Sequence, residues 1–190
     1  MTYCIETRNH FLRFALEALH QRNRYKQGVC IVDLTSCHSL HDVLRRVQRN
    51  SDARRFIFIG NSSAVSRVLA SLISIESTYS LQQYHEKIRH CPGASYEDVM
   101  RLLMAHRNME NFTQRDKTTV YGLLLNDSMN DAARIAGVSP KLFYMRLNRL
   151  VKLLNMRSSL QAHQFFRDEY HPSFVRQKIH EHRWSSVGLK

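Results

Sequence analysis

The sequence predicts an α/β domain followed by an all-α domain. In residues 1–90, short apolar runs alternate with amphipathic stretches, which is the pattern of a parallel sheet covered by helices. From Phe112 onward, apolar residues recur only at helical spacing. The break at Cys91-Pro92-Gly93 separates the two patterns. With 190 residues, the chain is long enough for two small domains.

Four strands and four helices are expected in the first part. The run 28–34 is apolar throughout, as a strand covered on both faces should be, and it ends at Asp33-Leu34. The other strands are expected at 3–6, at 55–60 and, more weakly, at 74–80, and the helices between and after them at 10–21, 41–49, 64–74 and 81–89. This order gives a shortened α/β domain over residues 1–90.

A linker with its own helix follows. Ser95 and Asp98 have the spacing of a capping box, which predicts a connector helix to about His106 inside a linker at 91–111. A four-helix domain is expected at 112–168 and a tail at 169–190 that holds Trp184.

Helix-start signals divide the second domain. Thr113 with Asp116, and Ser128 with Asp131, each predict a helix start. Gly137 to Ser139 predicts a tight turn, and Pro140 suits the first position of a helix that runs to about Leu154. A fourth helix is expected at 159–168.

Charge is the first indication of function. The chain has 28 Lys and Arg against 16 Asp and Glu, a net charge of +12, which favours an acidic partner. Positive charge is densest in residues 112–160, which contain eight basic and three acidic residues. No apolar run is long enough for a membrane helix and no secretory signal opens the chain, so we expect a cytoplasmic protein that does not bind membranes.

Catalytic and metal-binding patterns are not found in the sequence. The four cysteines form no Cys-x-x-Cys pair, and the group of Cys30, Cys37, His38 and His41 matches no standard zinc spacing. Phosphate-binding glycine loops and nucleophile elbows are missing as well. We therefore expect no enzymatic activity, no cofactor and no metal.

The helix at 140–154 has two different faces. Phe143, Leu147, Leu150 and Leu154 follow a 4-3-4 spacing and should form one buried stripe. Two helices joined by a short turn that contains Gly are typical of a helix-turn-helix, whose second helix enters the major groove. We expect base contacts from Tyr144, Met145 and Asn148, and phosphate contacts from Lys141, Arg146, Arg149 and Lys152.

These segments resemble a known family. Residues 112–116, 128–139 and 143–158 are similar to the four-helix DNA-binding domain of LuxR/FixJ/NarL-type transcriptional regulators, and part of the match also resembles Fis-type proteins. The resemblance implies a bacterial regulator that binds double-stranded DNA as a dimer and contacts RNA polymerase. Ala132 and Ala136 are smaller than the aliphatic residues usual in the family. Leu142 and Tyr144 replace its usual Thr and Lys, which puts the family's base contacts in question but not its docking mode.

The same family commonly carries a receiver domain in front, and residues 1–90 resemble a shortened one with four βα units where five are needed. Asp33 stands at the phosphoacceptor position. The first strand ends in a single acid, Glu6, where Mg²⁺ binding needs a pair, and no Lys follows the fourth strand before Lys87. A degenerate receiver that works without phosphorylation is therefore expected.

Two functions remain open at this point. The first is a sequence-specific DNA-binding regulator that dimerises partly through Leu160, Ala162, Phe165 and Phe166. The alternative is an auxiliary interaction module that pairs with another LuxR-type regulator and binds DNA weakly alone.

Overall fold

The structure, a computed structural model, describes residues 3–23, 28–126 and 128–177. The chain forms two compact units that divide between Asn108 and Met109, an α/β unit (unit 1) and a helical unit (unit 2). In the described residues no helix is long and apolar enough to cross a membrane.

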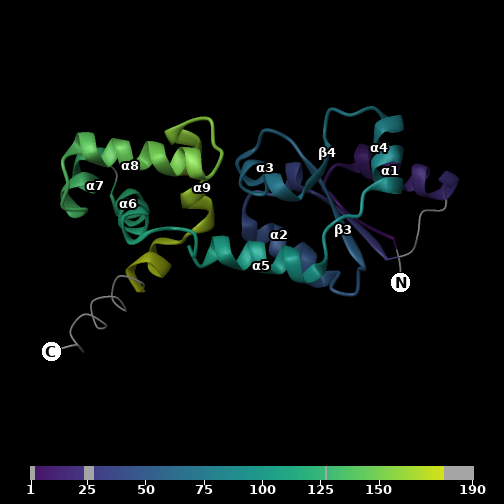
Figure 1. Cartoon of the computed structure of the whole chain (residues 1–190), viewed down its shortest axis with the longest axis horizontal. Helices are drawn as coiled ribbons and strands as arrows, with labels where there is room; N and C mark the ends of the chain where they lie inside the picture. The colour runs from purple at the N-terminus through teal and green to yellow at the C-terminus, as the bar shows by residue number, and fades with distance from the viewer. Residues whose placement is uncertain (1–2, 24–27, 127, 178–190) are drawn as a thin grey trace. The chain divides into compact units, whose positions relative to one another are not determined.

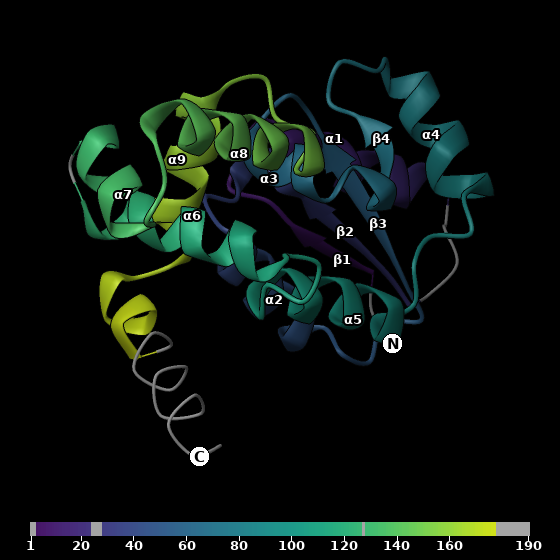
Figure 2. The ribbon, with the colours of Figure 1, turned by 60° about the vertical axis from the view of Figure 1, so that its left-hand side comes forward.

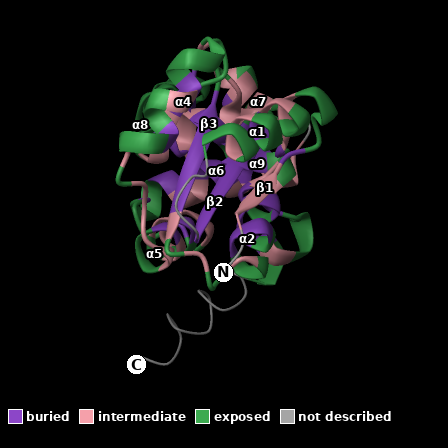
Figure 3. Cartoon of the chain, turned by 90° about the vertical axis from the view of Figure 1, so that its right-hand side faces the viewer, coloured by how far each residue is buried: buried purple, intermediate pink, exposed green. Residues whose placement is uncertain are grey.

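Unit 1 is built on four parallel strands, as the alternating sequence pattern predicted. They are β1 (Cys4–Glu6), β2 (Val29–Asp33), β3 (Arg55–Gly60) and β4 (Ile73–Glu76), and they lie side by side in chain order (Figures 1 and 2). Ile31 of β2 pairs with Ile5 on one side and with Ile57 on the other. The central strands β2 and β3 are buried along almost their whole length (Figure 3).

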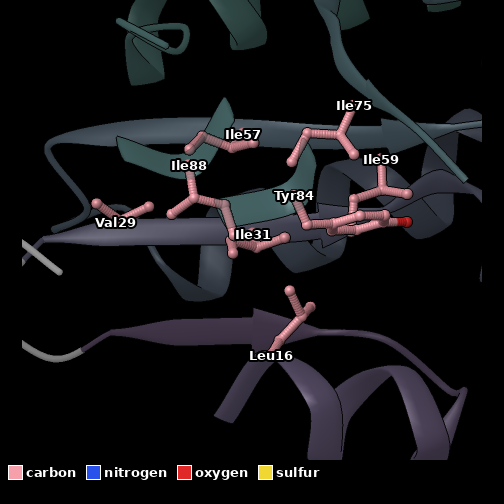
Figure 4. Packing of buried hydrophobic residues seen from close by; sticks show 8 residues of the cluster. All are labelled: Leu16, Val29, Ile31, Ile57, Ile59, Ile75, Tyr84 and Ile88. Carbon is pink, nitrogen blue, oxygen red and sulfur yellow. The ribbon is translucent and has the colours of Figure 1, made fainter. Parts of the chain in front are cut away.

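Helices cover both faces of the sheet. Helices α1 (His10–Asn23) and α4 (Leu81–His90) cover one face, where Leu16, Tyr84 and Ile88 pack against alternate residues of the strands (Figure 4). On the other face lie α2 (Leu40–Arg49) and α5 (Tyr96–Arg107). Since neighbouring strand residues point to opposite faces, Phe56 packs there, with its ring 6.4 Å from that of Tyr96.

The strand order gives unit 1 an unusual pair of crossovers. The connections from β1 to β2 and from β2 to β3 step across the sheet in the same direction, yet α1 and α2 lie on opposite faces. Two such crossovers necessarily have opposite hands. About 98% of crossovers between parallel strands are right-handed, so one of these two is the rare left-handed form.

Two expected boundaries in unit 1 were wrong. The helix predicted at 64–74 ends much earlier, with α3 (Ala64–Val68) followed by the 3₁₀ turn η2 (Ala70–Leu72), and β4 ends at Glu76 rather than Ser80. A further 3₁₀ turn, η1 (Leu34–Ser36), follows β2. A Cβ atom on Gly60 would overlap the side chain of Ile73, so glycine permits β4 to begin this close to β3.

Most of the segment expected as a linker at 91–111, namely residues 91–108, is part of unit 1. Ala94 forms an antiparallel bridge with Phe56 of β3, and the guanidinium of Arg55 donates to the carbonyl of Ile88 at 2.9 Å. Helix α5 then packs on α2 through buried Val99 and Leu103. Its apolar face therefore completes the core of unit 1, and α5 is not a free connector.

Unit 2 contains the expected helices. They are α6 (Gln114–Leu125), α7 (Met129–Ile135), α8 (Pro140–Leu153) and α9 (Ser159–Glu169). Hydroxyl side chains of Thr113, Ser128, Ser139 and Ser158 cap the four helices, in each case by accepting from the backbone N–H three residues later. The chain is helical again at 172–177.

Candidate nucleic-acid interface

A four-residue turn, 136–139, joins α7 to α8. Gly137 has a φ of +65°, which glycine adopts without strain, and its N–H donates to Arg134 O at 3.1 Å. Val138 N–H donates to Ala133 O at 3.0 Å, so the end of α7 is closed by backbone hydrogen bonds. Ser139 then caps α8 and Pro140 occupies its first turn.

Three helices meet closely beneath this turn. A Cβ atom on Gly122 of α6 would lie 3.0 Å from the Ala132 carbonyl oxygen and 3.2 Å from the Phe143 ring. The small Ala132 and Ala133 of α7 are buried at the same junction, and the Phe143 side chain is fully buried. The large phenylalanine therefore fills the space that the small residues leave, and α7 and α8 are held at a fixed angle.

The buried stripe of α8 is the predicted one. Phe143, Leu147 and Leu150 are fully buried, and Leu154 is 2% exposed. Lys141, Met145, Asn148 and Lys152, which we call the outer face of α8, lie opposite this stripe and are exposed, with Met145 61% exposed. Tyr144, 47% exposed, flanks this face, and Arg146 is half-buried. The outer face thus combines two cations, one amide and one apolar side chain.

The electrostatic character of α8 is uniformly positive. Its sequence contains Lys141, Arg146, Arg149 and Lys152 and no acidic residue. The exposed cations lie on the rigid helix rather than on a loop, so their spacing is set by the helix itself. Such a face attracts a polyanion at long range and positions it at short range.

Arg149, whose side chain is 58% exposed, has a partner within unit 2 that the sequence did not predict. Its guanidinium lies 3.5 Å from the carboxylate of Asp116, which is 1% exposed. The same carboxylate accepts the Thr113 hydroxyl at 2.6 Å and the Thr113 N–H at 3.0 Å in the cap of α6. Arg149 thus joins α8 to the start of α6, and only its remaining N–H groups are available for a phosphate. The sequence identified Asp116 only as part of the cap with Thr113. It gave no indication that Asp116 also pairs with a residue 33 positions later.

The predicted dimerisation residues are mostly core residues. Ala162 and Phe166 are fully buried and Phe165 is 3% exposed. The Phe166 ring packs edge-on against Phe112 at 6.2 Å, which holds α9 against the segment just before α6. Their role as a partner surface was therefore a wrong prediction, and only Leu160, 73% exposed, can contact another molecule.

The tail begins as part of unit 2. Tyr170 is 4% exposed and Val175 is fully buried, and the Tyr170 ring stacks between Phe166 and Phe174. Trp184 lies outside the described residues.

Asp33, the expected phosphoacceptor position, is 1% exposed at the carboxyl end of β2. One carboxylate oxygen accepts the Thr7 hydroxyl at 2.6 Å, and the other accepts the Thr35 hydroxyl at 2.6 Å and the Thr35 N–H at 2.9 Å. Both oxygens are therefore hydrogen-bonded and shielded from solvent, so neither is exposed to attack a phosphoryl group in this conformation.

Comparisons with known proteins do not assign the chain to a family. No known protein-family model matches the sequence, and no curated protein matches it either.

Proposed function

We propose that this chain is a sequence-specific, double-stranded DNA-binding transcriptional regulator whose α8 enters the major groove. The observation that carries the proposal is the outer face of α8: two lysines, an exposed amide and an exposed methionine on one rigid, acid-free helix, opposite a buried stripe. The major groove is wide enough to admit a helix, and the short turn between α7 and α8 supports a helix-turn-helix arrangement.

The exposed side chains of α8 form two groups, those suited to base contacts and those suited to phosphate contacts. The Asn148 amide can pair bidentately with an adenine, while Met145 and Tyr144 offer apolar surface to a thymine methyl group, so we expect an A/T-containing half-site. Lys141 and Lys152, with Arg146, are suited to phosphate contacts that position the helix without reading sequence. Arg149 contributes mainly by fixing α8 on α6 through Asp116.

Unit 1 fits a shortened receiver. The five-stranded receiver order is 2-1-3-4-5. Removal of its second strand leaves four strands in chain order, as here. In the full order the first crossover steps away from the others, which places the first helix on the face opposite the next ones. If the second strand of a receiver and the helix after it are missing here, α1 and α2 are expected on opposite faces of the sheet, as they are.

The proposed function is tested by binding to duplex DNA. The purified chain should select a recurring sequence from a random duplex pool and bind it with an affinity that falls steeply as salt rises. A chain that enriches no sequence, or that binds single strands in preference to duplexes, would refute the proposal.

We predict that Asp33→Asn, which keeps the shape of the side chain, leaves affinity for the selected duplex within about twofold of the original. Both Asp33 oxygens are occupied in the fold, so treatment with acetyl phosphate and Mg²⁺ should add no mass to the protein. Intact-mass measurement and duplex titration check this. A phosphorylated original chain whose affinity changes, next to an unresponsive variant, would show a working receiver.

The alternative function, an interaction module for another regulator, is favoured by one observation. Phe11 and Phe14 of α1 are 89% and 75% exposed and lie one turn apart, on the side of the helix away from buried Leu16. Exposed aromatic side chains in a group are typical of protein interaction sites. In a regulator that reads two half-sites, this surface would join two copies. In an auxiliary module it would bind the related regulator instead.

We therefore expect Phe11→Ser/Phe14→Ser to weaken self-association at least tenfold, because it removes the largest exposed apolar surface of α1. Sedimentation equilibrium at micromolar concentration measures this, with Leu160→Ser as the control in unit 2. Loss of association in the Leu160 variant alone would place the dimer contact on α9. An original chain that stays monomeric and binds DNA weakly would favour the auxiliary module.

A further inference from the structure

Unit 1 contains a pocket that the proposed DNA contact does not use. It has a volume of about 620 Å³ and is lined by the end of β1, the two residues after it, and α2: Glu6, Thr7, Arg8, Asp42, Arg45, Arg46, Gln48 and Arg49. That volume is in the range of small-molecule sites. In open parallel sheets, ligands bind outside the carboxyl ends of the strands, where this pocket lies.

The pocket walls carry excess positive charge. The lining contains four guanidinium groups and two carboxylates, which gives it a net charge of +2. Arg45 and Arg49 stand one helical turn apart on α2, and their side chains are 60% and 66% exposed. Arg8 is exposed and reaches the pocket from the loop after β1. Three exposed cations therefore line one opening, two from α2 and one from the loop after β1.

The two carboxylates are already engaged. Glu6 accepts the Asn50 amide at 2.9 Å and pairs with Arg49 at 3.3 Å. Asp42 accepts the His38 N–H at 3.1 Å and pairs with Arg45. Burial opposes ionisation of Asp42, but the His38 N–H and Arg45 outweigh it and keep its pKa below the ordinary value. These acids orient the arginines, and each arginine keeps N–H groups that make no contact with them.

Arg46 supplies a buried charge without a carboxylate partner. It is 6% exposed, and its guanidinium donates to the Ser36 hydroxyl at 2.8 Å, to the Ser36 carbonyl at 3.0 Å and to the Glu6 carbonyl at 3.1 Å. Across the described ranges it forms no ion pair. These neutral oxygens satisfy the N–H groups of the buried guanidinium but do not cancel its charge, which adds to the positive potential of the pocket wall.

We propose that this pocket binds a small molecule through a phosphate group, with Arg8, Arg45 and Arg49 as its ligating side chains. Each guanidinium group can donate two hydrogen bonds to a pair of oxygens. A phosphate group has enough oxygens and charge to accept from several guanidinium groups placed around it. A single planar carboxylate saturates one fork and leaves the others unused. The site would make unit 1 a sensor of a phosphorylated metabolite.

Isothermal titration calorimetry of the full chain tests the proposal at fixed ionic strength, with pyrophosphate, AMP and citrate as probes. We expect saturable one-to-one binding of pyrophosphate or AMP, weakened at least tenfold by Arg45→Gln/Arg49→Gln. Both side chains are largely exposed, so this variant should fold, and circular dichroism verifies that it does. The control, Arg89→Gln/Arg101→Gln, changes the net charge equally at exposed positions of α4 and α5 and should bind as the original does.

Three results would overturn the proposal. The first is no saturable binding of pyrophosphate or AMP up to millimolar concentration. The second is equal weakening by the control variant, which would indicate a general charge effect. The third is binding of citrate as tight as that of the phosphate compounds, which would show that the pocket does not select phosphate.

Discussion

Replacement of Phe143 by alanine is expected to lower the free energy of unfolding of unit 2 by about 3–5 kcal/mol. The side chain is fully buried and its ring lies against the positions of Gly122 and Ala132, where α6, α7 and α8 meet. Alanine leaves most of the volume of the ring unfilled at this junction, so the variant should leave a cavity. Denaturant unfolding of the full chain, followed by the circular dichroism signal, measures the loss.

Tyr144→Ala is the matched control for this variant. It removes an aromatic ring from the next position of the same helix, but that ring is 47% exposed and should cost well under half as much. If both variants lost the same free energy, or if Phe143→Ala lost less than Tyr144→Ala, the orientation of α8 described here would be wrong.

Removal of two charges from the outer face of α8 should have the largest effect on binding. The variant Lys141→Ala/Lys152→Ala is expected to weaken affinity for all duplexes alike, by tenfold or more near physiological salt, and to reduce the salt slope by roughly two units. Both side chains are exposed, so the fold should not change. Fluorescence anisotropy over a series of salt concentrations gives the affinity and the slope together.

The same loss of charge can be made in unit 1. Lys87→Ala/Arg89→Ala lowers the net charge equally on exposed positions of α4. If binding depended on total charge alone, the two variants would behave alike, and the assignment of α8 as the DNA-binding helix would fail. We expect the α4 variant to keep its slope within about half a unit of the original.

Local signals explain why most elements could be predicted. The continuous apolar run of β2 has no solvent-facing position, and Asp33 ends it as expected. The caps at Thr113, Ser128 and Ser139 are contacts of three residues or fewer, so the sequence contains both partners of each. The buried stripe of α8 followed from its spacing because one helix face must be covered.

Long-range contacts explain what was missed. Residues 91–108 of the linker expected at 91–111 belong to unit 1 because Ala94 pairs with Phe56 and α5 covers α2, and a capping box does not reveal what a helix packs against. The apolar residues of α9 were assigned to a partner because spacing shows that a face is apolar but not which surface buries it. The Arg149–Asp116 pair and the pocket arginines likewise come together only through the fold.

The central claim is that the outer face of α8 reads DNA sequence, and Asn148→Ala tests it most directly. The variant, the original chain and Asn130→Ala, which removes an exposed amide from α7, are titrated with the selected duplex and with a shuffled duplex of the same composition. We predict that Asn148→Ala loses about 1–3 kcal/mol on the selected duplex and almost nothing on the shuffled one. Equal affinity of the folded Asn148→Ala variant and the original chain for the selected duplex would contradict the account.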